Sequence, residues 1–501
     1  MSLSSKKTNL QTWVAIWRAD ILVCVLGLLL GSFVLSFNAF CHGYPPGYAG
    51  MFVLMAEQIA AENFSLPQEI YFYGPGGVPF AYPPLAHYIM ALAFRMGVSA
   101  WTYMRFMPAV FSLIALVPLY GLTRQLGASR WAGMAVMLIA AFSPYLYSPH
   151  TWAAGVVRAP AFGLMLIGLF FAAGAMRGVR LRRFTILAGF FFGLTILTHL
   201  GYAFAFSLWI IAWVCAQPCW KNWYIGLSIA LVGILVALPW LLTILTRYGI
   251  DVFVGALSSH GTGGFLNSLG SFTSIFNYLV KTLEPIFASL PLALFFLVGL
   301  ITALFHKKIN LVLAFVFIAL FSAESNRFVM ASILPLIGYG LSFPVRRLEI
   351  FKRLFAIIGI LFFAYYGFSE IKNFRLRIGG QARELAAFIQ KNTDARDRYL
   401  ILTPQDEAEW FPWLLQREPL IAQWGSEWLG KFDEQTFYMY QLGGCVYEDD
   451  YNCLQNLILQ VGEPEMLITV WQQKHIASQL NADPAWEITY ENSRYVLWER
   501  R

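Results

Sequence analysis

Four side chains in residues 1–370 combine a reactive group with a position beside an apolar segment. Glu57 supplies a carboxylate, and His42 supplies an imidazole whose usual pKa of about 6.5 suits proton transfer at neutral pH. Arg327 and Arg158 each begin an apolar segment, where the planar fork of a guanidinium can grip phosphate oxygens. Each also has a structural reading: Glu57 as a solvated helix residue, His42 as an interfacial residue, and Arg327 as a cation that reaches lipid headgroups or pairs with Glu324.

Three further candidates lie in loops rich in glycine or proline. Tyr82 and His87 flank the Pro83-Pro84 start of a short helix, and His260 lies in a glycine-rich stretch at 258–264. Such loops can close over a substrate, although His87 can equally bond within its own loop. The sequence has no phosphate-binding glycine motif, dinucleotide fingerprint, Ser/His/Asp arrangement or metal-ligand cluster. It therefore predicts no intrinsic cofactor and gives no support for a divalent metal.

The composition of the chain indicates whether lipid or water surrounds these residues. Hydrophobic residues make up 58% of the chain and charged residues only 13%, with a mean hydropathy of +0.58. Residues 371–501 hold 19 of the 28 acidic residues, so the composition changes near residue 370. The net charge is +7, but the basic residues form no stripe with interleaved aromatic residues, which argues against nucleic acid as a partner. These features predict a membrane domain at 1–370, with membrane lipids as its surroundings, and a separate domain at 371–501.

The elements that must position the candidates are apolar helices. A span needs about 20 apolar residues, and about eleven segments qualify or nearly do: 20–39, 106–123, 131–148, 158–176, 184–200, 202–217, 223–245, 286–305, 309–323, 328–345 and 354–369. Lysine and arginine concentrate in every second connection, which predicts a cytoplasmic N-terminus in the plasma membrane. The first span lacks a small-residue cleavage site and is read as an uncleaved anchor. An odd number of spans then makes the C-terminal domain extracytoplasmic.

Two long loops, at about 40–104 and 246–285, fall on the same side as that domain. In the first loop, apolar spacing predicts a helix at 49–63 lying on the membrane surface and a second short helix at 85–96. Together they would form a lid over a cavity in the bundle. The C-terminal domain reads as mixed α/β, with a helix at 381–392 and strands at 399–402, 466–471 and 495–498. Cys445 and Cys453 predict a disulfide in an oxidising compartment, because their spacing is not a zinc pattern.

The order of these features resembles the GT-C superfamily of membrane glycosyltransferases. The likeness rests on the uncleaved first span, the long loop with two short helices, the Tyr-Pro-Pro-Leu helix start at 82–85, Arg-Phe-Met-Pro-Ala at 105–109 and Arg-Gln-Leu-Gly at 124–127. It is closest to the branch that contains protein O-mannosyltransferases, aminoarabinose transferases and uncharacterised bacterial relatives. The runs 409–414 and 424–428 look like the outside domain of some of those relatives. The implied fold is an all-α polytopic bundle with an extracytoplasmic α/β domain.

The resemblance implies transfer of a sugar from a polyprenyl-phosphate carrier to an acceptor on the extracytoplasmic face of the membrane. Such chemistry needs a carboxylate or other base and cations for the donor phosphate, roles for which Glu57, His42, Arg327 and Arg158 are the candidates. The sequence departs from the family where an Asp is expected after the first span, because it has Pro45-Pro46 there.

Three hypotheses follow. The first is an inverting glycosyltransferase with a non-standard base. The second is an inactive protein of the same fold that acts as a structural or assembly subunit of a membrane complex. The third is a transporter or flippase, which is weakened by the scarcity of ionisable residues in the span centres and by the absence of an apparent inverted repeat.

Overall fold

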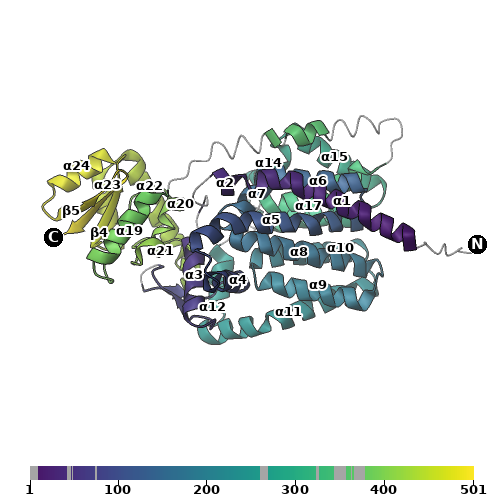
Figure 1. The fold of residues 1–501 in the computed structure, drawn as a ribbon, viewed down its shortest axis with the longest axis horizontal. Helices are drawn as coiled ribbons and strands as arrows, with labels where there is room; N and C mark the ends of the chain where they lie inside the picture. Colours follow the sequence, from purple (N-terminus) through teal and green to yellow (C-terminus); the bar gives the residue numbers. More distant parts are fainter. Residues whose placement is uncertain are drawn as a thin grey trace, which may run out of the picture.

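The computed structural model describes residues 10–41, 47, 49–73, 76–259, 269–322, 326–343, 357–362, 364–365 and 378–501. These residues form a helical bundle that contains the N-terminal helix and a smaller α/β part that contains the C-terminus (Figure 1). The candidates His42 and His260, part of the predicted span 354–369 and the expected boundary near 370 lie outside the described residues.

The bundle follows the predicted apolar segments. Its helices are α1 (Leu10–Leu35), α5 (Ala100–Gln125), α6 (Arg130–Phe142), α7 (Pro144–Thr151), α8 (Gly155–Met176), α9 (Leu181–Ile196), α10 (Leu200–Ala216), α11 (Trp220–Tyr248), α14 (Phe272–Phe287), α15 (Leu290–Phe305), α16 (Ile309–Phe321) and α17 (Asn326–Leu341). Every predicted segment from 20–39 to 328–345 contains such a helix.

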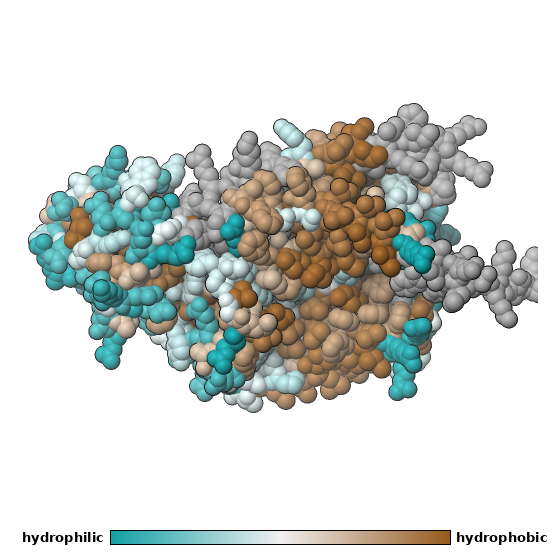
Figure 2. Space-filling model, in the orientation of Figure 1, coloured by the Kyte–Doolittle hydropathy of each residue, from teal (hydrophilic) through white to brown (hydrophobic). Residues whose placement is uncertain are grey.

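The predicted count of about eleven spans is not confirmed. Among the described residues, four helices are long and apolar enough to cross a membrane: α1, α5, α8 and α11. The number rises to six if each of two bent pairs is one span: α6 with α7, at 62°, and α14 with α15, at 102°. Side chains of high hydropathy cover the visible face of the bundle, whereas hydrophilic ones dominate the α/β part (Figure 2). The protein is therefore an integral membrane protein.

Helix α17 lies at the centre of the bundle. Most of its residues are buried, and it packs against α5, α6, α7, α14, α15 and α16. A Cβ atom added at Gly340 would lie 2.6 Å from the Cα of Gly299 on α15, so the two backbones meet at glycines. Small residues allow this approach where helices must pack without a hydrophobic driving force from water.

Three of the basic connections predicted to be cytoplasmic, at 124–130, 177–183 and Lys221, lie at one end of the bundle. Asp20 pairs with Arg124 at 3.2 Å and with Arg130 at 3.3 Å. Arg177 donates to the carbonyl of Gln125, which adjoins Arg124, and Lys221 donates to the carbonyl of Met176 at 3.2 Å. This clustering of cations at one end is what the alternation in the sequence requires. The side of the membrane to which this end belongs stays a prediction.

The first long loop forms α2 (Phe37–Cys41), α3 (Gly50–Ala61), a two-stranded sheet of β1 (Glu69–Ile70) and β2 (Val78–Pro79), and α4 (Leu85–Arg95). The prediction that the helix at 49–63 lies open on the membrane surface is wrong. Ten of the twelve residues of α3 are buried, because α4 covers one side and α21 of the C-terminal part covers another. A side chain at Gly50 would collide with the carbonyl of Glu409, so glycine permits this contact. In the second loop, α12 (Asp251–Ser259) packs against η2 (Ser426–Leu429).

The C-terminal part is mixed α/β, as predicted. Besides η2 it contains α19 (Gly380–Asn392), β3 (Tyr399–Ile401), α20 (Gln405–Ala408), α21 (Phe411–Leu415), α22 (Phe432–Glu448), α23 (Tyr451–Val461), β4 (Met466–Val470), α24 (Lys474–Ala482), β5 (Trp486–Glu491) and β6 (Tyr495–Arg500). The sheet order is β3-β4-β6-β5, with β3 parallel to β4 and the other pairs antiparallel. Sequence patterning located β3, β4 and β6 but missed β5.

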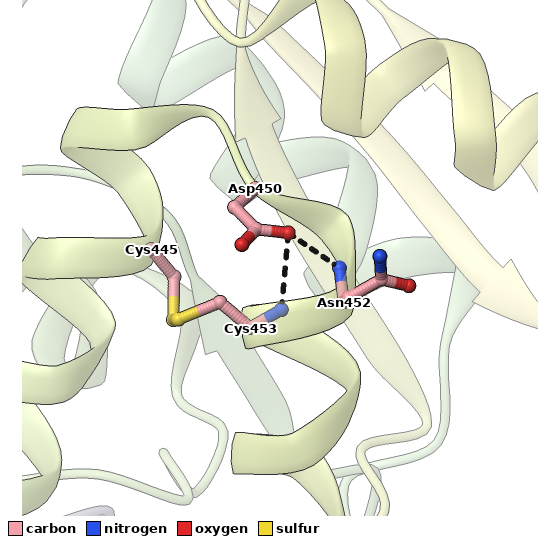
Figure 3. Close-up of a disulfide and its surroundings, with 4 residues drawn as sticks. All are labelled: Cys445, Asp450, Asn452 and Cys453. Carbon is pink, nitrogen blue, oxygen red and sulfur yellow. Dashed lines mark hydrogen bonds between the residues drawn. A yellow bond between two sulfur atoms is a disulfide. The ribbon is translucent and has the colours of Figure 1, made fainter.

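The structure joins Cys445 to Cys453 in a disulfide (Figure 3). The bond connects the end of α22 to the start of α23, whose first amides are capped by Asp450. The carboxylate of Asp450 accepts from the backbone N–H of Asn452 at 2.9 Å and of Cys453 at 3.2 Å. The disulfide and the cap together fix the angle between two consecutive helices.

Candidate functional site

Two arginines nominated from the sequence lie near the same pair of buried side chains. His150 on α7 and Tyr202 on α10 share a hydrogen bond between Nε2 and the phenol oxygen. The guanidinium of Arg327 lies 5.6 Å from the centre of the Tyr202 ring. Arg158, at the start of α8, and Arg327, at the start of α17, both interact electrostatically with His150 and with Tyr202. We call these four residues the arginine cluster.

Helix ends bring the arginine cluster together. Ser143 and Pro144 interrupt the apolar run of α6, and α7 turns by 62° with proline in its first turn, where no amide hydrogen is needed. A Cβ atom at Gly155 would collide with the carbonyl of His150, so only glycine lets α8 begin this close to α7. His199 caps the start of α10 by accepting from the amide of Gly201 at 3.1 Å.

Aromatic rings connect the arginine cluster to the first loop and to the C-terminal part. The ring of His199 lies 5.2 Å from that of Tyr202 and 6.1 Å from that of Tyr82. Tyr82 in turn lies 6.2 Å from Trp428 of η2. The sequence candidates Tyr82 and Arg327 therefore belong to one continuous group of side chains, at the bundle end that contacts the C-terminal part. Arg158 acts electrostatically on the same His150–Tyr202 pair.

His87 is a packed loop residue in this structure. Its ring is fully buried among Phe52, Phe80 and Tyr82, and Nδ1 lies 3.2 Å from the carbonyl oxygen of Pro83. Burial lowers the pKa of His87 to about 4, so the imidazole is neutral at physiological pH. The contact with Pro83 is the within-loop bond that the sequence offered as an alternative to substrate binding.

Glu57 lies in a different group of contacts from the arginine cluster. Its carboxylate accepts a hydrogen bond of 3.0 Å from the indole of Trp413 on α21, and Trp413 packs on Trp101 with ring centres 5.0 Å apart. Burial raises the pKa of the Glu57 carboxyl, whereas the bond from Trp413 opposes that rise. The structure thus places Glu57 where the first loop meets the C-terminal part.

Sequence reasoning missed a second buried carboxyl in the same interface. Glu409 is 6% exposed, and its Oε2 accepts from the hydroxyl of Tyr73 in the first loop at 2.8 Å. Burial, aided by the nearby carboxyls of Glu427 and Asp406, raises the pKa of Glu409 to about 8. It was overlooked because its neighbours in the chain suggested an aromatic motif, and only long-range contacts bury it. Tyr202 was also missed, because its bond to His150 joins two separate helices and is visible only in the tertiary structure.

No group of three or more His, Cys, Asp or Glu residues in the described part of the chain is arranged to hold a metal ion. His42 and His260 lie outside the described residues, so their relation to the arginine cluster stays a prediction.

Comparison with known proteins gives the fold. No protein-family model and no curated protein matches the sequence. The Archaeoglobus fulgidus oligosaccharyltransferase is similar in structure, with a TM-score of 0.60 and 14% identity over 95% of this chain and 73% of that chain. ArnT from Cupriavidus metallidurans, bound to undecaprenyl phosphate, has a TM-score of 0.58 and 12% identity over 95% of this chain and 97% of that chain.

The mycobacterial arabinofuranosyltransferase AftD is also similar, with a TM-score of 0.52 and 12% identity over 96% of this chain, which spans 40% of that larger protein. All three are GT-C glycosyltransferases, and the match covers the C-terminal part as well as the bundle. This chain is therefore an integral membrane protein with the GT-C glycosyltransferase fold.

Proposed function

We propose that the protein transfers a sugar from a polyprenyl-phosphate donor to an acceptor on the extracytoplasmic face of the plasma membrane. The observation that carries the proposal is the convergence of Arg158 and Arg327 on the His150–Tyr202 pair. Two guanidinium groups near one buried pair suit a phosphate better than a neutral ligand. One protein of similar fold, ArnT, binds undecaprenyl phosphate, which supports the same class of carrier lipid here.

In the proposed reaction, the arginines stabilise charge on the leaving phosphate. The acceptor hydroxyl loses its proton to a base and forms a bond to the anomeric carbon of the sugar. The bond between that carbon and the phosphate oxygen breaks, and the polyprenyl phosphate leaves with the electron pair and an additional negative charge. Attack from the opposite face inverts the anomeric centre.

We propose Glu57 as the first base to test and His42 as the second. Glu57 is half-buried with a raised pKa, which suits a carboxylate that must accept a proton near neutral pH. Its bond to Trp413 would orient the carboxylate. His87 is a weaker candidate because burial lowers its pKa to about 4 and its ring is enclosed.

The donor site is tested by measuring retained lipid. Wild type, Arg327→Ala and Arg327→Lys are purified, and bound undecaprenyl phosphate is quantified by mass spectrometry after incubation with that lipid. We expect wild type to retain the lipid, Arg327→Ala to lose it, and Arg327→Lys to keep part of it, because lysine keeps the charge without the fork. The matched control is Arg183→Ala, which removes an exposed arginine from α9 outside the arginine cluster. Equal retention by all four proteins would refute the assignment.

The base is tested separately. Glu57→Gln should retain undecaprenyl phosphate but lose transfer of sugar from the donor, whereas Trp413→Phe should lower the rate and shift its pH profile. The phenylalanine variant removes the indole donor to Glu57 and keeps an aromatic ring, although a smaller one, next to Trp101. A Glu57→Gln protein with full transfer activity would eliminate Glu57 and direct the same test to His42.

A second candidate function is that of a non-catalytic subunit in a membrane complex. It is favoured by Pro45-Pro46 in place of the expected Asp and by the use of Glu57 as a contact between the first loop and the C-terminal part. This candidate predicts that Glu57→Gln and Trp413→Phe lower thermal stability to a similar extent and that wild type has no transferase activity. Retention of undecaprenyl phosphate through Arg327 together with sugar transfer would exclude it.

A further inference from the structure

The C-terminal part contains an open cleft of about 740 Å³. It lies beyond the ends of β3 and β4, where Thr403, Pro404, Gln472 and Gln473 follow the two strands. Because β3 and β4 are parallel, their carboxyl ends meet at the same edge of the sheet. Such an edge is where open α/β sheets bind small ligands, and the volume falls within the range of about 300–1,000 Å³ usual for ligand sites.

One wall of the cleft is a face of α22 that exposes backbone and aromatic rings. Gly443 and Gly444 both line it, and a Cβ atom at either would have no neighbour within 4 Å. Two consecutive glycines inside a helix destabilise that helix, so we infer that they serve to keep the wall of the cleft open. Tyr440 and Tyr447 line the same wall and are 72% and 91% exposed. The wall therefore offers a flat strip of backbone flanked by two accessible rings.

The floor of the cleft holds buried hydroxyls without partners. Tyr399 is 0% exposed and Thr403 is 7% exposed, and neither side-chain oxygen has a hydrogen-bond partner within the described part of the chain. Both oxygens are closed off from solvent, so a ligand in the cleft would contact the accessible atoms around them and not the hydroxyls themselves. Gln405 and Gln423 line the cleft beside them, joined to each other by a side-chain hydrogen bond.

Charge selects against an anionic ligand. The residues that line the cleft include no lysine, arginine or histidine. Their two carboxyl groups are both engaged: Asp449 accepts from the amides of His475 and Ile476 at the start of α24, and Glu409 accepts from Tyr73. Burial raises the pKa of Glu409 to about 8, so it is mostly protonated at neutral pH. Among its described residues the cleft thus has no cation for an anionic ligand, several polar side chains and two exposed aromatic rings, which is chemistry that fits a sugar chain.

We propose that this cleft binds an uncharged oligosaccharide through accessible side-chain amides, such as those of Gln405 and Gln472, with Tyr440 and Tyr447 stacking on sugar rings. On the proposed function, on which this part of the inference rests, that oligosaccharide is the acceptor. The residues that line the cleft come from elements of the C-terminal part such as β3, α20 and α22, whereas the arginine cluster belongs to helices of the bundle. The two parts are seen in Figure 1. The disulfide in Figure 3 follows the glycine pair directly and holds the end of α22 that forms the wall.

The test measures carbohydrate binding by the full-length protein in lipid nanodiscs, without sugar-based detergent. The probes are mannotetraose, cellotetraose and chitotetraose, with tetragalacturonate as the anionic comparison, and the readout is saturation-transfer NMR. We expect at least one uncharged probe to bind and tetragalacturonate to bind more weakly. Gly444→Leu should abolish binding by filling the cleft, and Tyr440→Ala should weaken it about tenfold. The matched control is Phe437→Ala, which removes an exposed ring of α22 that does not line the cleft.

The outcomes separate this inference from the proposed function. Arg327→Ala should lose undecaprenyl phosphate but keep the oligosaccharide, whereas Gly444→Leu should do the opposite. Because nothing lies within 4 Å of the new Cβ, Gly444→Leu should fold, and retained lipid binding would demonstrate that it has. Absence of binding by all three uncharged probes, or equal binding by tetragalacturonate, would overturn the inference while leaving the donor site intact. Binding that Gly444→Leu leaves unchanged would overturn the assignment to this cleft.

Discussion

Replacement of Glu409 by glutamine should change the pH dependence of stability. The carboxyl of Glu409 is buried, and its pKa rises from 4.5 to about 8, chiefly through loss of solvation. Well below pH 4.5 the carboxyl is protonated in both the folded and the unfolded chain, so its titration does not change the free energy of unfolding. As the pH rises from 4.5 towards 8, the unfolded chain releases the proton while the folded chain keeps it, so the free energy of unfolding falls.

The magnitude follows from that pKa change. Each pKa unit is worth about 1.36 kcal/mol, so the full loss by pH 8 is about 5 kcal/mol, an upper value for one buried group. Glutamine is nearly isosteric with the protonated acid, cannot ionise, and its oxygen can still accept the hydrogen bond from Tyr73. Glu409→Gln should therefore match wild type only below its unfolded pKa of 4.5 and become progressively more stable than wild type towards pH 8.

The assay is unfolding of full-length wild type and Glu409→Gln in nanodiscs at several values between pH 5 and pH 8, followed by tryptophan fluorescence. Comparing the two proteins cancels the titration of every other group. Tyr73→Phe is the companion variant, because it removes the hydroxyl that favours the ionised carboxyl and should steepen the dependence on pH. Parallel curves for wild type and Glu409→Gln would refute the reasoning, since they would mean that Glu409 titrates alike in both states.

Three further predictions concern stability. Arg494→Ala should lower the free energy of unfolding by about 3–5 kcal/mol in urea unfolding of the C-terminal part. The variant leaves the carboxylate of Glu407, whose side chain is 1% exposed, without its cationic partner. Arg501→Ala breaks an exposed ion pair and should cost less than about 1 kcal/mol. Gly340→Ala should cost about 1–3 kcal/mol in thermal unfolding, because its methyl group would meet Gly299, and an unchanged melting temperature would contradict that contact. Replacing both cysteines of the disulfide by serine should cost about 2.5 kcal/mol, measured by urea unfolding with and without reductant.

The broad organisation of the protein was predictable because hydropathy and composition are sums over neighbouring residues. Apolar runs located helices throughout the bundle, and the change in acidic content separated the α/β part. Span count was less predictable. The bend between α6 and α7 divides the apolar run predicted as one span at 131–148, and α14 lies within the loop predicted at 246–285. A hydropathy window does not register a change of direction. The burial of α3 was also unpredictable, because its cover comes from α21, more than 300 residues away.

The candidate residues themselves were determined by the sequence, but their grouping was not. Residue type and position beside an apolar segment selected Arg158, Arg327 and Glu57. Only tertiary structure brought the two arginines to the His150–Tyr202 pair and directed Glu57 towards Trp413 instead. Helix crossings and capped turns set these neighbours, and they depend on side-chain packing between segments far apart in the chain. The sequence alone therefore determined that lipid surrounds most of the chain, where its helices form and which reactive side chains are present. Packing between distant segments decided which of those side chains lie together.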